Sequence, residues 1–347
     1  MRNLINEQST LLEALALLNS LPASAMTLFV TDSRGAVTGS LTDGDIRRAL
    51  LSGHSLESPV VDAACHSFKA LRGDESDVEL IRDCRSMGIK LLPRLNADGT
   101  PAEIVDLSTV RSRLPLSAIL MAGGKGERLR PMTLTTPKPL LTIEGKAIID
   151  YNIEALAAVG VTNITVTTRY LADKLDEHFA RPVAGVDVRT VREDMPLGTI
   201  GSARLADIPA EGNTLVMNSD LITTISFEEL YLKHRDSEAD ATIAVVPYQV
   251  SVPYAILTLD GDRVTGIAEK PAYSYYANAG IYIFRNRLLR GLTPDKRTDA
   301  TDLIDEIIAS GGKVAYYPIK GTWIDVGSPT DFRQAAELMR HHNNLSR

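Results

Sequence analysis

The feature that most constrains this chain is the alternation, over residues 116–347, of apolar strand-like runs with segments of helical spacing. The expected strands lie at residues 118–122, 163–168, 186–192, 214–218, 241–246 and 279–284, and the expected helices at 148–158 and 172–179. This alternation is typical of a mostly parallel sheet with helices on both faces. We therefore predict a doubly wound α/β domain, followed by an outer helix over residues 330–342. Ligands bind such sheets at the carboxyl ends of the strands, so the site is expected in the loops after them.

The first 112 residues have a different organisation. A helix at residues 11–18 precedes a β-hairpin over 26–41 and a helix that starts at Thr42. After roughly 64 residues a helix at 78–87 and a hairpin over 88–106 follow the same order. This self-similarity predicts an α+β domain of two equivalent halves at residues 1–112, with the α/β domain at 116–347.

Composition narrows the class of partner. The 347 residues carry a net charge of -7, which argues against a nucleic-acid partner held by phosphate neutralisation. Two cysteines, Cys65 and Cys84, exclude a disulfide scaffold and a four-cysteine zinc site. No apolar stretch approaches the ~18 residues of a spanning helix, and the first residues lack the apolar run of a secretory leader. We therefore expect a cytoplasmic protein without a membrane partner.

A glycine-rich turn comes directly after the first strand of the second domain, at residues 121–131 (MAGGKGERLRP). Gly123, Gly124 and Gly126 allow a tight turn whose backbone N–H groups can approach an anion. The turn lacks both the Gly-Lys-Ser/Thr of a Walker loop and the Gly-x-Gly-x-x-Gly spacing of a dinucleotide site. Such a turn alone would be weak evidence, but residues 136–140 (TPKPL) follow it. The two prolines there stiffen the backbone around Lys138.

The combined pattern, GGKGERL followed by TPKPL, resembles the signature of the sugar-1-phosphate nucleotidylyltransferases, and the resemblance extends over about residues 117–333. It implies a nucleotidyltransferase domain of the GT-A or Rossmann-like type. It also implies transfer of a nucleoside monophosphate from a nucleoside triphosphate to a sugar 1-phosphate, with pyrophosphate released by direct in-line displacement. Positioning and charge neutralisation would then carry the rate.

The resemblance implies a role for each charged group near the triphosphate. Arg128 would hold the departing β,γ-phosphates, Lys138 would neutralise charge around the α-phosphate, and the amides of the glycine-rich turn would line the triphosphate. Asp220, directly after a strand, and Asp325 match positions whose carboxylates hold Mg²⁺. These four side chains form the expected catalytic set, although either aspartate taken singly could be a helix cap.

On the sugar side, the resemblance points to Glu269, Lys270, Asn278 and Gly280. The carboxylate would accept hydrogen bonds from sugar hydroxyls, the ammonium would contact the sugar phosphate, and the amide offers both donors and acceptors. This chain departs from the family at Ala255, where a glycine usually follows a tyrosine. The additional methyl group leaves the identity of the sugar open.

The loop at residues 193–203 (EDMPLGTIGSA) stands where the family reads the base, with Glu193, Gly198 and Thr199 as expected nucleotide contacts. Guanine presents two adjacent N–H donors, which match the two oxygens of a carboxylate, whereas uracil and thymine would set acceptor against acceptor. We therefore favour GTP. The alternative is a solvated Glu193 and a base read by the backbone alone.

The two halves of the N-terminal domain resemble a tandem cystathionine-β-synthase (CBS) pair, a module that often binds an adenine nucleotide. Thr42 and Asp45 match its nucleotide motif in the first half, and the second half lacks that motif. The alternatives are that Thr42 merely caps a helix and that the domain is a structural or dimerising module. A CBS pair ahead of such a transferase resembles a bacterial group that makes GDP-sugars, including GDP-glucosamine, for legionaminic-acid-type sugars. A homo-oligomer is expected.

The leading interpretation is thus a Mg²⁺-dependent sugar-1-phosphate guanylyltransferase with glucosamine 1-phosphate or another hexosamine or hexose 1-phosphate as acceptor. Within the same class, a mannose-1-phosphate guanylyltransferase and a uridylyl- or thymidylyltransferase remain open. A third hypothesis, from a different class, is a regulatory protein that senses nucleotide and has lost catalysis.

Overall fold

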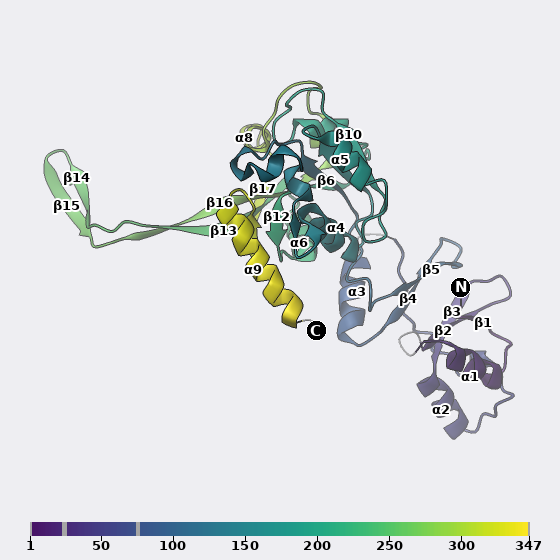
Figure 1. Cartoon of the computed structure of the whole chain (residues 1–347). Coiled ribbons are helices and arrows are strands. Elements are labelled where there is room, and N and C mark those ends of the chain that lie inside the picture. The colour runs from purple at the N-terminus through teal and green to yellow at the C-terminus, as the bar shows by residue number, and fades with distance from the viewer. Residues whose placement is uncertain (1, 23–25, 74–76, 346–347) are drawn as a thin grey trace. The chain divides into compact units, whose positions relative to one another are not determined.

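The computed structural model describes residues 2–22, 26–73 and 77–345, with side chains through residue 340 (Figure 1). Contacts between residues divide the chain into two compact units. One consists of Met1–Pro115 with Ala158–Gly160, and the other of Leu116–Ala157 with Val161–Arg347. None of the helices described is long and apolar enough to cross a membrane.

The N-terminal unit contains the repeated helix and hairpin expected from the sequence. In chain order its elements are β1 (Leu4–Asn6), α1 (Leu11–Ser20), β2 (Thr27–Thr31), β3 (Val37–Thr42), α2 (Asp43–Leu51), α3 (Asp77–Ser86), β4 (Leu91–Leu95) and β5 (Pro101–Asp106). β1, which was not expected, lies parallel to β2, and an isolated parallel bridge joins Leu71 to Arg94 beside β4. The two halves therefore share their strand arrangement as well as their order.

Each half of this unit has its own apolar core. In the first half, side chains of α1 such as Leu11 and Leu18 pack against Leu28 of β2 and Ile46 of α2. The second half is built around a separate cluster of Leu71, Ile81, Cys84, Leu92, Val105 and Leu107. Phe29, Val37 and Leu91 pack together across the two halves. Cys65 and Cys84 are both free thiols.

The C-terminal unit is built on a seven-stranded sheet. Its strands are β6 (Leu116–Ala122), β9 (Ile164–Thr168), β10 (Val188–Arg192), β11 (Asn213–Asn218), β13 (Ala241–Ser251), β16 (Ala272–Arg285) and β17 (Val314–Pro318), in the spatial order β10-β9-β6-β11-β16-β13-β17. Neighbouring strands pair in parallel except on either side of β16, which runs against both β11 and β13. The prediction of an α/β fold with a mostly parallel sheet is confirmed.

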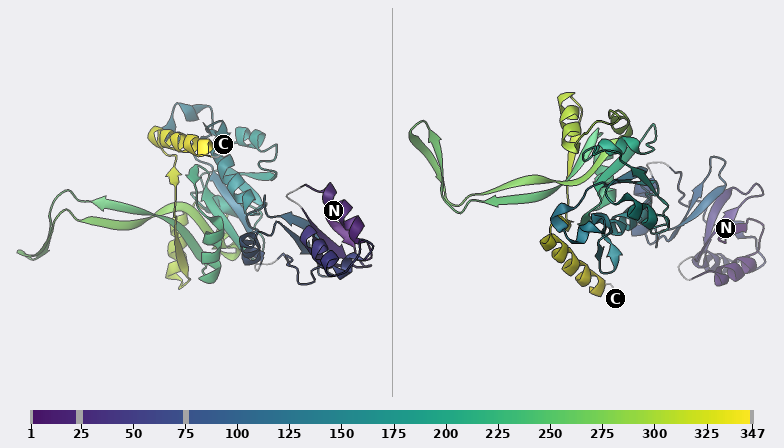
Figure 2. Two further views of the ribbon diagram at one scale, coloured as in Figure 1. Left: turned by 90° about the horizontal axis from the view of Figure 1, so that it is seen from below. Right: turned by 45° about the horizontal axis from the view of Figure 1, so that its top comes forward.

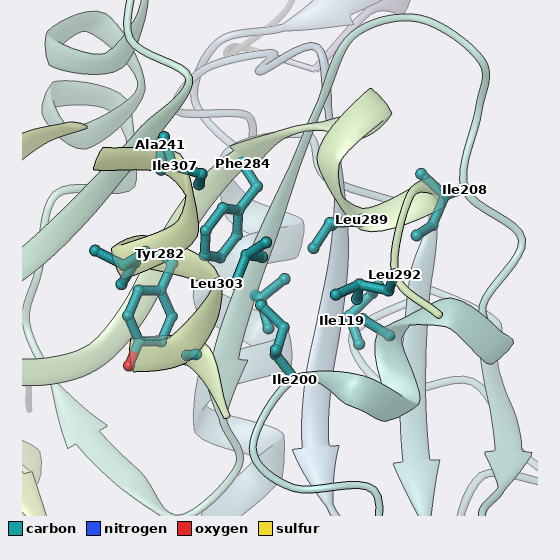
Figure 3. Packing of buried hydrophobic residues seen from close by; sticks show 14 of the residues in the cluster. Ile119, Ile200, Ile208, Ala241, Tyr282, Phe284, Leu289, Leu292, Leu303 and Ile307 are labelled. Atoms are coloured by element: carbon teal, nitrogen blue, oxygen red, sulfur yellow. The ribbon is translucent and has the colours of Figure 1, made fainter. Parts of the chain in front are cut away.

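Helices cover this sheet because its central strands are apolar on both sides (Figure 1). The helices are α4 (Ile148–Ala158), α5 (Ala172–His178), α6 (Phe227–Asp236), α7 (Asn286–Arg290), α8 (Ala300–Ala309) and α9 (Pro329–Leu345). In β6, Ile119 faces a cluster that includes Phe284 and Leu303 of α8, while its neighbours Ala118 and Leu120 are buried on the opposite face (Figure 3). A doubly wound sheet follows from this double burial.

Several short elements beside the sheet were not expected. β12 (Leu221–Thr223) and β18 (Trp323–Asp325) form an antiparallel pair, and β7 (Thr142–Ile143) pairs with β8 (Lys146–Ala147). A cluster containing Leu129, Ile222 and Ile324 packs these pieces against Ala335 of α9. Strands of two or three residues carry too little alternation to be recognised from sequence.

The largest departure from expectation is the length of β13 and β16. These strands were expected to end at residue 246 and to begin at 279, but they continue as a paired ribbon to Ser251 and from Ala272. At its end lies a second hairpin, formed by β14 (Ile256–Asp260) and β15 (Arg263–Ala268). We call residues 247–276 the arm. In all three views the arm extends away from the sheet and helices of its own unit, which we call the body (Figures 1 and 2).

Candidate active site

A cavity of about 660 Å³ opens beside the carboxyl ends of β6 and β11, where the sequence places the site. Nine of the predicted site residues line it: Gly123, Gly124, Gly126, Arg128, Lys138, Glu193, Gly198, Thr199 and Asp220. Two hydrogen bonds join the strand ends, because Ser219 donates to the carbonyl of Met121 from its hydroxyl (2.6 Å) and from its N–H (3.3 Å). The sheet thus holds the glycine-rich turn next to Asp220.

The glycine-rich turn needs glycine at two positions. Gly126 has a left-handed φ of 61°, and a Cβ there would lie 3.0 Å from Thr133 Cγ2 and 3.1 Å from Lys138 Cβ. The Thr133 hydroxyl also donates to the Gly126 carbonyl at 2.8 Å. At Gly123 a Cβ would lie 2.7 Å from Glu193 Oε1. A side chain at either of these two positions would crowd its neighbours, and all three glycines of the turn line the cavity.

Lys138, Asp220 and Asp325 come together from three distant parts of the chain. The Lys138 ammonium forms an ion pair with Asp220 and lies 3.5 Å from Asp325 Oδ1, and only 11% of the lysine side chain is exposed. Pairing of β12 with β18 sets Leu221 opposite Asp325, and the N–H of Val326 donates to the carbonyl of Asp220 at 3.1 Å. Asp325 does not line the cavity itself but reaches it through this contact with the lysine.

The electrostatics of the pair suit a divalent cation. Burial raises the pKa of Asp325, and the negative charge of Asp220 raises it further, against the opposing effect of Lys138 and Arg128. Two adjacent carboxylates are hard oxygen donors of the kind Mg²⁺ prefers, and Mg²⁺ usually completes its shell with water and phosphate oxygens. The described residues contain no cluster of three or more metal-ligating side chains. The donor set therefore fits a metal ion shared with a phosphate ligand.

Arg128 is an exposed residue whose side chain lies at the cavity wall. The guanidinium lies next to Gly327, where a Cβ would come 3.1 Å from Arg128 Nη2. Gly327 lies two residues after Asp325. The guanidinium, the ammonium and Asp220 therefore line the same cavity, and Asp325 lies within reach of the charges of Arg128 and Lys138.

The loop that begins at Glu193 is tied to the start of α8. Gly198 has φ 83°, and a Cβ there would lie 2.4 Å from the carbonyl oxygen of Thr298. Thr199 donates its N–H to Asp299 Oδ1 at 2.8 Å, and its hydroxyl accepts from the N–H of Ala300 at 2.8 Å. Gly198 and Thr199 therefore have a structural role beside their predicted contact with the nucleotide.

Glu193 itself is buried, with 6% of the residue exposed. Its Oε2 accepts a long hydrogen bond from the N–H of Leu197 at 3.4 Å, and its Oε1 faces Gly123. The carboxylate is thus part of the cavity wall rather than a solvated side chain. A ligand in the cavity could approach it.

The predicted sugar residues are divided between two places. Ala255, Glu269 and Lys270 are exposed on the arm and do not line the cavity. Asn278 and Gly280 lie where the arm joins the sheet, with the N–H of Gly280 donating to Asn278 Oδ1 at 2.9 Å.

The junction of arm and sheet touches the cavity through one residue. A Cβ on Gly280 would lie 2.5 Å from Asn218 Nδ2, and Asn218 lines the cavity. Trp323 donates its indole N–H to the carbonyl of Ala279 at 2.9 Å and so fixes the same segment. The predicted nucleotide residues therefore line one cavity, whereas Glu269 and Lys270 do not line it.

Sequence reasoning missed six polar residues of the cavity: Glu127, Arg169, Asn218, Ser219, Arg297 and Asp299. Arg169 follows the last residue of β9 directly. The rule that found Asp220, which selects polar residues just after buried strands, would have found it too. Arg297 comes from the segment before α8, whose place over the cavity depends on its contacts with the loop at 197–201.

In the N-terminal unit, Thr42 and Asp45 contact each other. The Thr42 hydroxyl donates to Asp45 Oδ2 at 2.6 Å, and the pair forms a capping box at the start of α2. Thr42 also lines a separate cavity of about 520 Å³, whose other lining residues include Phe29, Cys65 and Lys90, whereas Asp45 does not line it. The capping role is present, and Thr42 is in addition open to a ligand.

Comparison with known proteins agrees with this site. Residues 117–342 match the family described as nucleotidyl transferase. A protein of Sulfolobus acidocaldarius is 33% identical over 221 residues, which are 62% of this chain and 61% of that protein. The mannose-1-phosphate guanylyltransferase catalytic subunit beta of Danio rerio is 31% identical over 226 residues, 62% of each chain. The chain thus spans just over three fifths of the length of these relatives.

Among solved structures, HddC from Yersinia pseudotuberculosis is 27% identical with a TM-score of 0.51, and the match covers 65% of this chain and 99% of HddC. The same protein complexed with GMP-PN matches at 25% identity and the same TM-score of 0.51. Both matches cover 65% of this chain. Residues 117–342, which match the family, make up well over half of the chain and include every residue that lines the cavity. This chain therefore belongs to the nucleotidyl transferase family.

Proposed function

We propose that this protein transfers a nucleoside monophosphate from a nucleoside triphosphate, with GTP favoured, to a sugar 1-phosphate. The observation that carries the proposal is the convergence of a bare glycine-rich turn, Arg128, Lys138 and two carboxylates at one cavity. Relatives named as mannose-1-phosphate guanylyltransferases and a solved relative complexed with GMP-PN support it.

In the proposed reaction, an oxygen of the sugar phosphate attacks the α-phosphorus in line. The bond from the α-phosphorus to the β-bridging oxygen breaks, and pyrophosphate leaves with its electron pair. Arg128 would bind the leaving pyrophosphate, and Lys138 would offset the charge that grows around the α-phosphate. The backbone N–H groups of the glycine-rich turn would bind the triphosphate oxygens. No covalent intermediate with the protein is needed, so positioning supplies the rate.

Asp220 and Asp325 would hold Mg²⁺, which supplies charge neutralisation to the phosphates when bound. The proximity of the Lys138 ammonium to both acids supports this proposal, because the same pair of carboxylates attracts a cation in the protein alone. The Lys138 ammonium, which contacts both acids and lines the cavity, would lie beside the phosphates of a bound nucleotide.

Glu193 would select the base. Its buried carboxylate has acceptor capacity left beyond the long bond from Leu197, and guanine offers two adjacent N–H donors to it. Uracil or thymine would leave two acceptors facing each other, which costs several kcal/mol in a dry site. A uridylyl- or thymidylyltransferase is the alternative that this argument disfavours. The acceptor sugar, glucosamine 1-phosphate or mannose 1-phosphate among others, depends on residues of the arm.

For the N-terminal unit we propose a CBS-like role in sensing an adenine nucleotide. The specific observation in its favour is the cavity of about 520 Å³ that Thr42 and Lys90 line. Titration calorimetry of the full-length protein with AMP, ADP and ATP tests it, with GTP saturating the other cavity. Heat that disappears in Thr42→Val would support the site, and no heat with any adenine nucleotide would leave a structural role.

The test of the main proposal is turnover. Full-length protein is incubated with Mg²⁺, each of the four nucleoside triphosphates and a panel of hexose and hexosamine 1-phosphates. We expect pyrophosphate release and a nucleotide sugar of the correct mass, fastest with GTP. Equal rates with UTP would remove the role of Glu193, and no turnover with any pair would refute the transferase function.

A further inference from the structure

Arg169 is a cavity residue to which the proposed reaction gives no task. It follows Thr168, the last residue of β9, and lines the same cavity as Lys138 and Asp220. Arg169 is half-buried, and among the residues that the structure describes its guanidinium has no hydrogen-bond or ion-pair partner. N–H donors that are partly removed from water and lack an acceptor indicate a place where a ligand binds.

Two other cations of the cavity have acidic partners. Lys138 forms an ion pair with Asp220. Arg297 lies 3.4 Å from Asp299 Oδ2. Since Arg169 is paired with no acid of the described chain, its charge and its donors are available to a bound molecule.

The backbone around Arg169 is fixed on both sides. Before it, the carbonyl of the buried Thr168 accepts a hydrogen bond from the N–H of Glu193 at 2.8 Å. After it, the Tyr170 hydroxyl donates to the carbonyl of Thr133 at 2.9 Å. The side chain of Arg169 therefore starts from a defined point in the cavity wall.

The hydrogen bond from Glu193 also makes the two residues neighbours in the sheet. Thr168 is paired with Arg192 of β10, and the N–H of Glu193 continues this parallel ladder by one residue. The backbones of Arg169 and Glu193 are thus about one strand spacing apart, or about 4.8 Å. Their charges are opposite, yet the two side chains form no ion pair in the described structure, and Glu193 Oε1 faces Gly123 instead.

Charge indicates which part of a nucleotide would lie here. Glu193 is 6% exposed, and its carboxylate would repel the phosphates of a nucleoside triphosphate. Asp220 and its partner Lys138 follow the opposite logic, because a cation and a metal-binding acid suit phosphates. Arg169 follows β9, which is one strand from β10 and two strands from β11, so it is nearer to Glu193 than to Asp220 in the sheet. The base of the nucleotide is therefore the part that Arg169 would meet.

We propose that Arg169 reads guanine at O6 and N7, beside the N1–H and N2–H that Glu193 would read. The two edges are adjacent on the base, as the two residues are adjacent at the strand ends, and the planar fork of a guanidinium matches the acceptor pair O6 and N7. Adenine carries an amino donor in place of O6, which would face the donors of Arg169. Arg169 is thus a specificity-determining residue for guanine, a role that rests on the proposed function.

The first test is equilibrium binding by titration calorimetry, with Mg²⁺ present and without a sugar phosphate. The probes are GTP and 7-deaza-GTP, in which a C–H group replaces N7 and the other polar groups of the base are kept. The wild type should bind 7-deaza-GTP about tenfold more weakly, because one hydrogen bond from a charged donor is lost. Equal affinities for the two nucleotides would overturn the proposal.

The variant Arg169→Met keeps the aliphatic part of the side chain and removes its donors. It should bind GTP at least about tenfold more weakly than the wild type and should no longer distinguish GTP from 7-deaza-GTP. A ratio that stays at the wild-type value, with or without weaker binding of both nucleotides, overturns the proposal, because another residue would then read N7. The matched control is Arg189→Ala, which removes an exposed guanidinium from β10 and should keep the wild-type ratio.

Inosine triphosphate, which lacks the N2 amino group, shows whether the base keeps its place in the variant. Its loss of affinity relative to GTP belongs to Glu193 and should be the same in the wild type and in Arg169→Met. If the variant loses this preference too, Arg169 positions the whole base instead of reading one edge, and the assignment is overturned. A wild type that binds both nucleotides equally would remove Glu193 from N2–H and the neighbouring edge from Arg169.

Turnover separates this proposal from the proposed function. If nucleotide sugar forms fastest from GTP but GTP and 7-deaza-GTP bind alike, only the role of Arg169 is refuted. If the wild type prefers GTP to 7-deaza-GTP in binding but forms no nucleotide sugar, the transferase function is refuted and the role of Arg169 stands. Tighter binding of UTP than of GTP would refute guanine as the base, and the role of Arg169 with it.

Discussion

The body and the arm of the C-terminal unit are parts of one sheet, yet they differ in how their functional residues are held. In the body, Lys138 is only 11% exposed and touches both Asp220 and Asp325. On the arm, Lys270 and Glu269 are exposed, and the large side chains around them face solvent. The difference teaches that buried strands hold the predicted catalytic residues together, whereas the predicted sugar residues of the arm lie on a ribbon that is exposed to solvent.

The strongest way to break this comparison is to remove a charge from the body. Asp220→Asn should lower kcat by at least about 1,000-fold, or about 4 kcal/mol, because the variant loses one of its two carboxylates for Mg²⁺. Steady-state pyrophosphate release measures it, with circular dichroism to verify folding. Asp236→Asn, on the exposed end of α6, is the matched control and should keep wild-type rates. Near-normal turnover in Asp220→Asn would remove this residue from the site.

The next largest expected effect is on the free energy of unfolding, and it distinguishes a glycine of the body from a glycine of the arm. Gly198→Ala combines left-handed backbone strain with a Cβ placed 2.4 Å from the Thr298 carbonyl oxygen, so we expect a loss of about 3 kcal/mol in the free energy of unfolding. Gly261→Ala, at the tip of the arm, has φ 60° but open space around it and should cost about 1 kcal/mol. Urea unfolding of both variants measures the difference. Equal losses would contradict the steric argument.

Acid should lower the stability of the body, because a histidine is buried there in its neutral form. Burial lowers the pKa of His234 on α6 to about 4, with a further contribution from Arg285 and an opposing one from Asp240. Its ring is neutral in the fold, accepting from the Thr242 hydroxyl and donating to Asn213 Oδ1. Between pH 6.5 and 4 the unfolded chain binds the extra proton, so stability rises with pH across this window and falls on acidification.

At pH 5 this linkage amounts to a loss of about 2 kcal/mol relative to pH 7. Urea unfolding as a function of pH measures it. The variant His234→Gln keeps polar atoms at the position but cannot titrate, so its stability should vary less over the same range. An unchanged slope in that variant would show that another group is responsible.

The smallest expected effect is the coupling free energy of one contact between the arm and the body. Tyr276 of the arm and Tyr316 of the body form one ring contact, with centroids 5.5 Å apart. A double-mutant cycle with Tyr276→Ala and Tyr316→Ala should give a coupling free energy of about 0.5–1 kcal/mol. Thermal unfolding measures the cycle. A value indistinguishable from zero would mean that the arm is not anchored at this point.

Much of the body could be predicted from sequence because its signals are local. The strand expected at 118–122 is an apolar run because both faces of β6 are buried, and the helix expected at 148–158 coincides with α4. The glycine-rich turn stands out for a physical reason, since Cβ atoms at Gly123 and Gly126 would collide with Glu193 and with Thr133. Such local constraints can be recognised from the sequence because they act on residues that are close together in the chain.

Contacts between segments that are far apart in the chain were harder to predict from the sequence. Residues 247–251 and 272–278 contain polar and apolar residues in alternation, but nothing in them indicates that they pair beyond the edge of the sheet. The family resemblance assigned Glu269, Lys270 and Asn278 to one pocket, whereas along the ribbon the first two lie far from the third. Likewise, Arg297 lines the cavity because the next residue, Thr298, is hydrogen-bonded to the loop at residues 197–201. The sequence around Arg297 contains no motif that would indicate this.

By itself, the amino-acid sequence determined the order of strands and helices, the turn that must be glycine and the charged residues available for phosphate chemistry. These properties follow from side-chain size, polarity and spacing over a few residues. Only the tertiary structure decided that β12 and β18 bring Asp220 and Asp325 to one lysine, and that Lys270 lies exposed on the arm and does not line the cavity. Pairing between segments about a hundred residues apart depends on the free energy of the whole sheet, which no local pattern encodes.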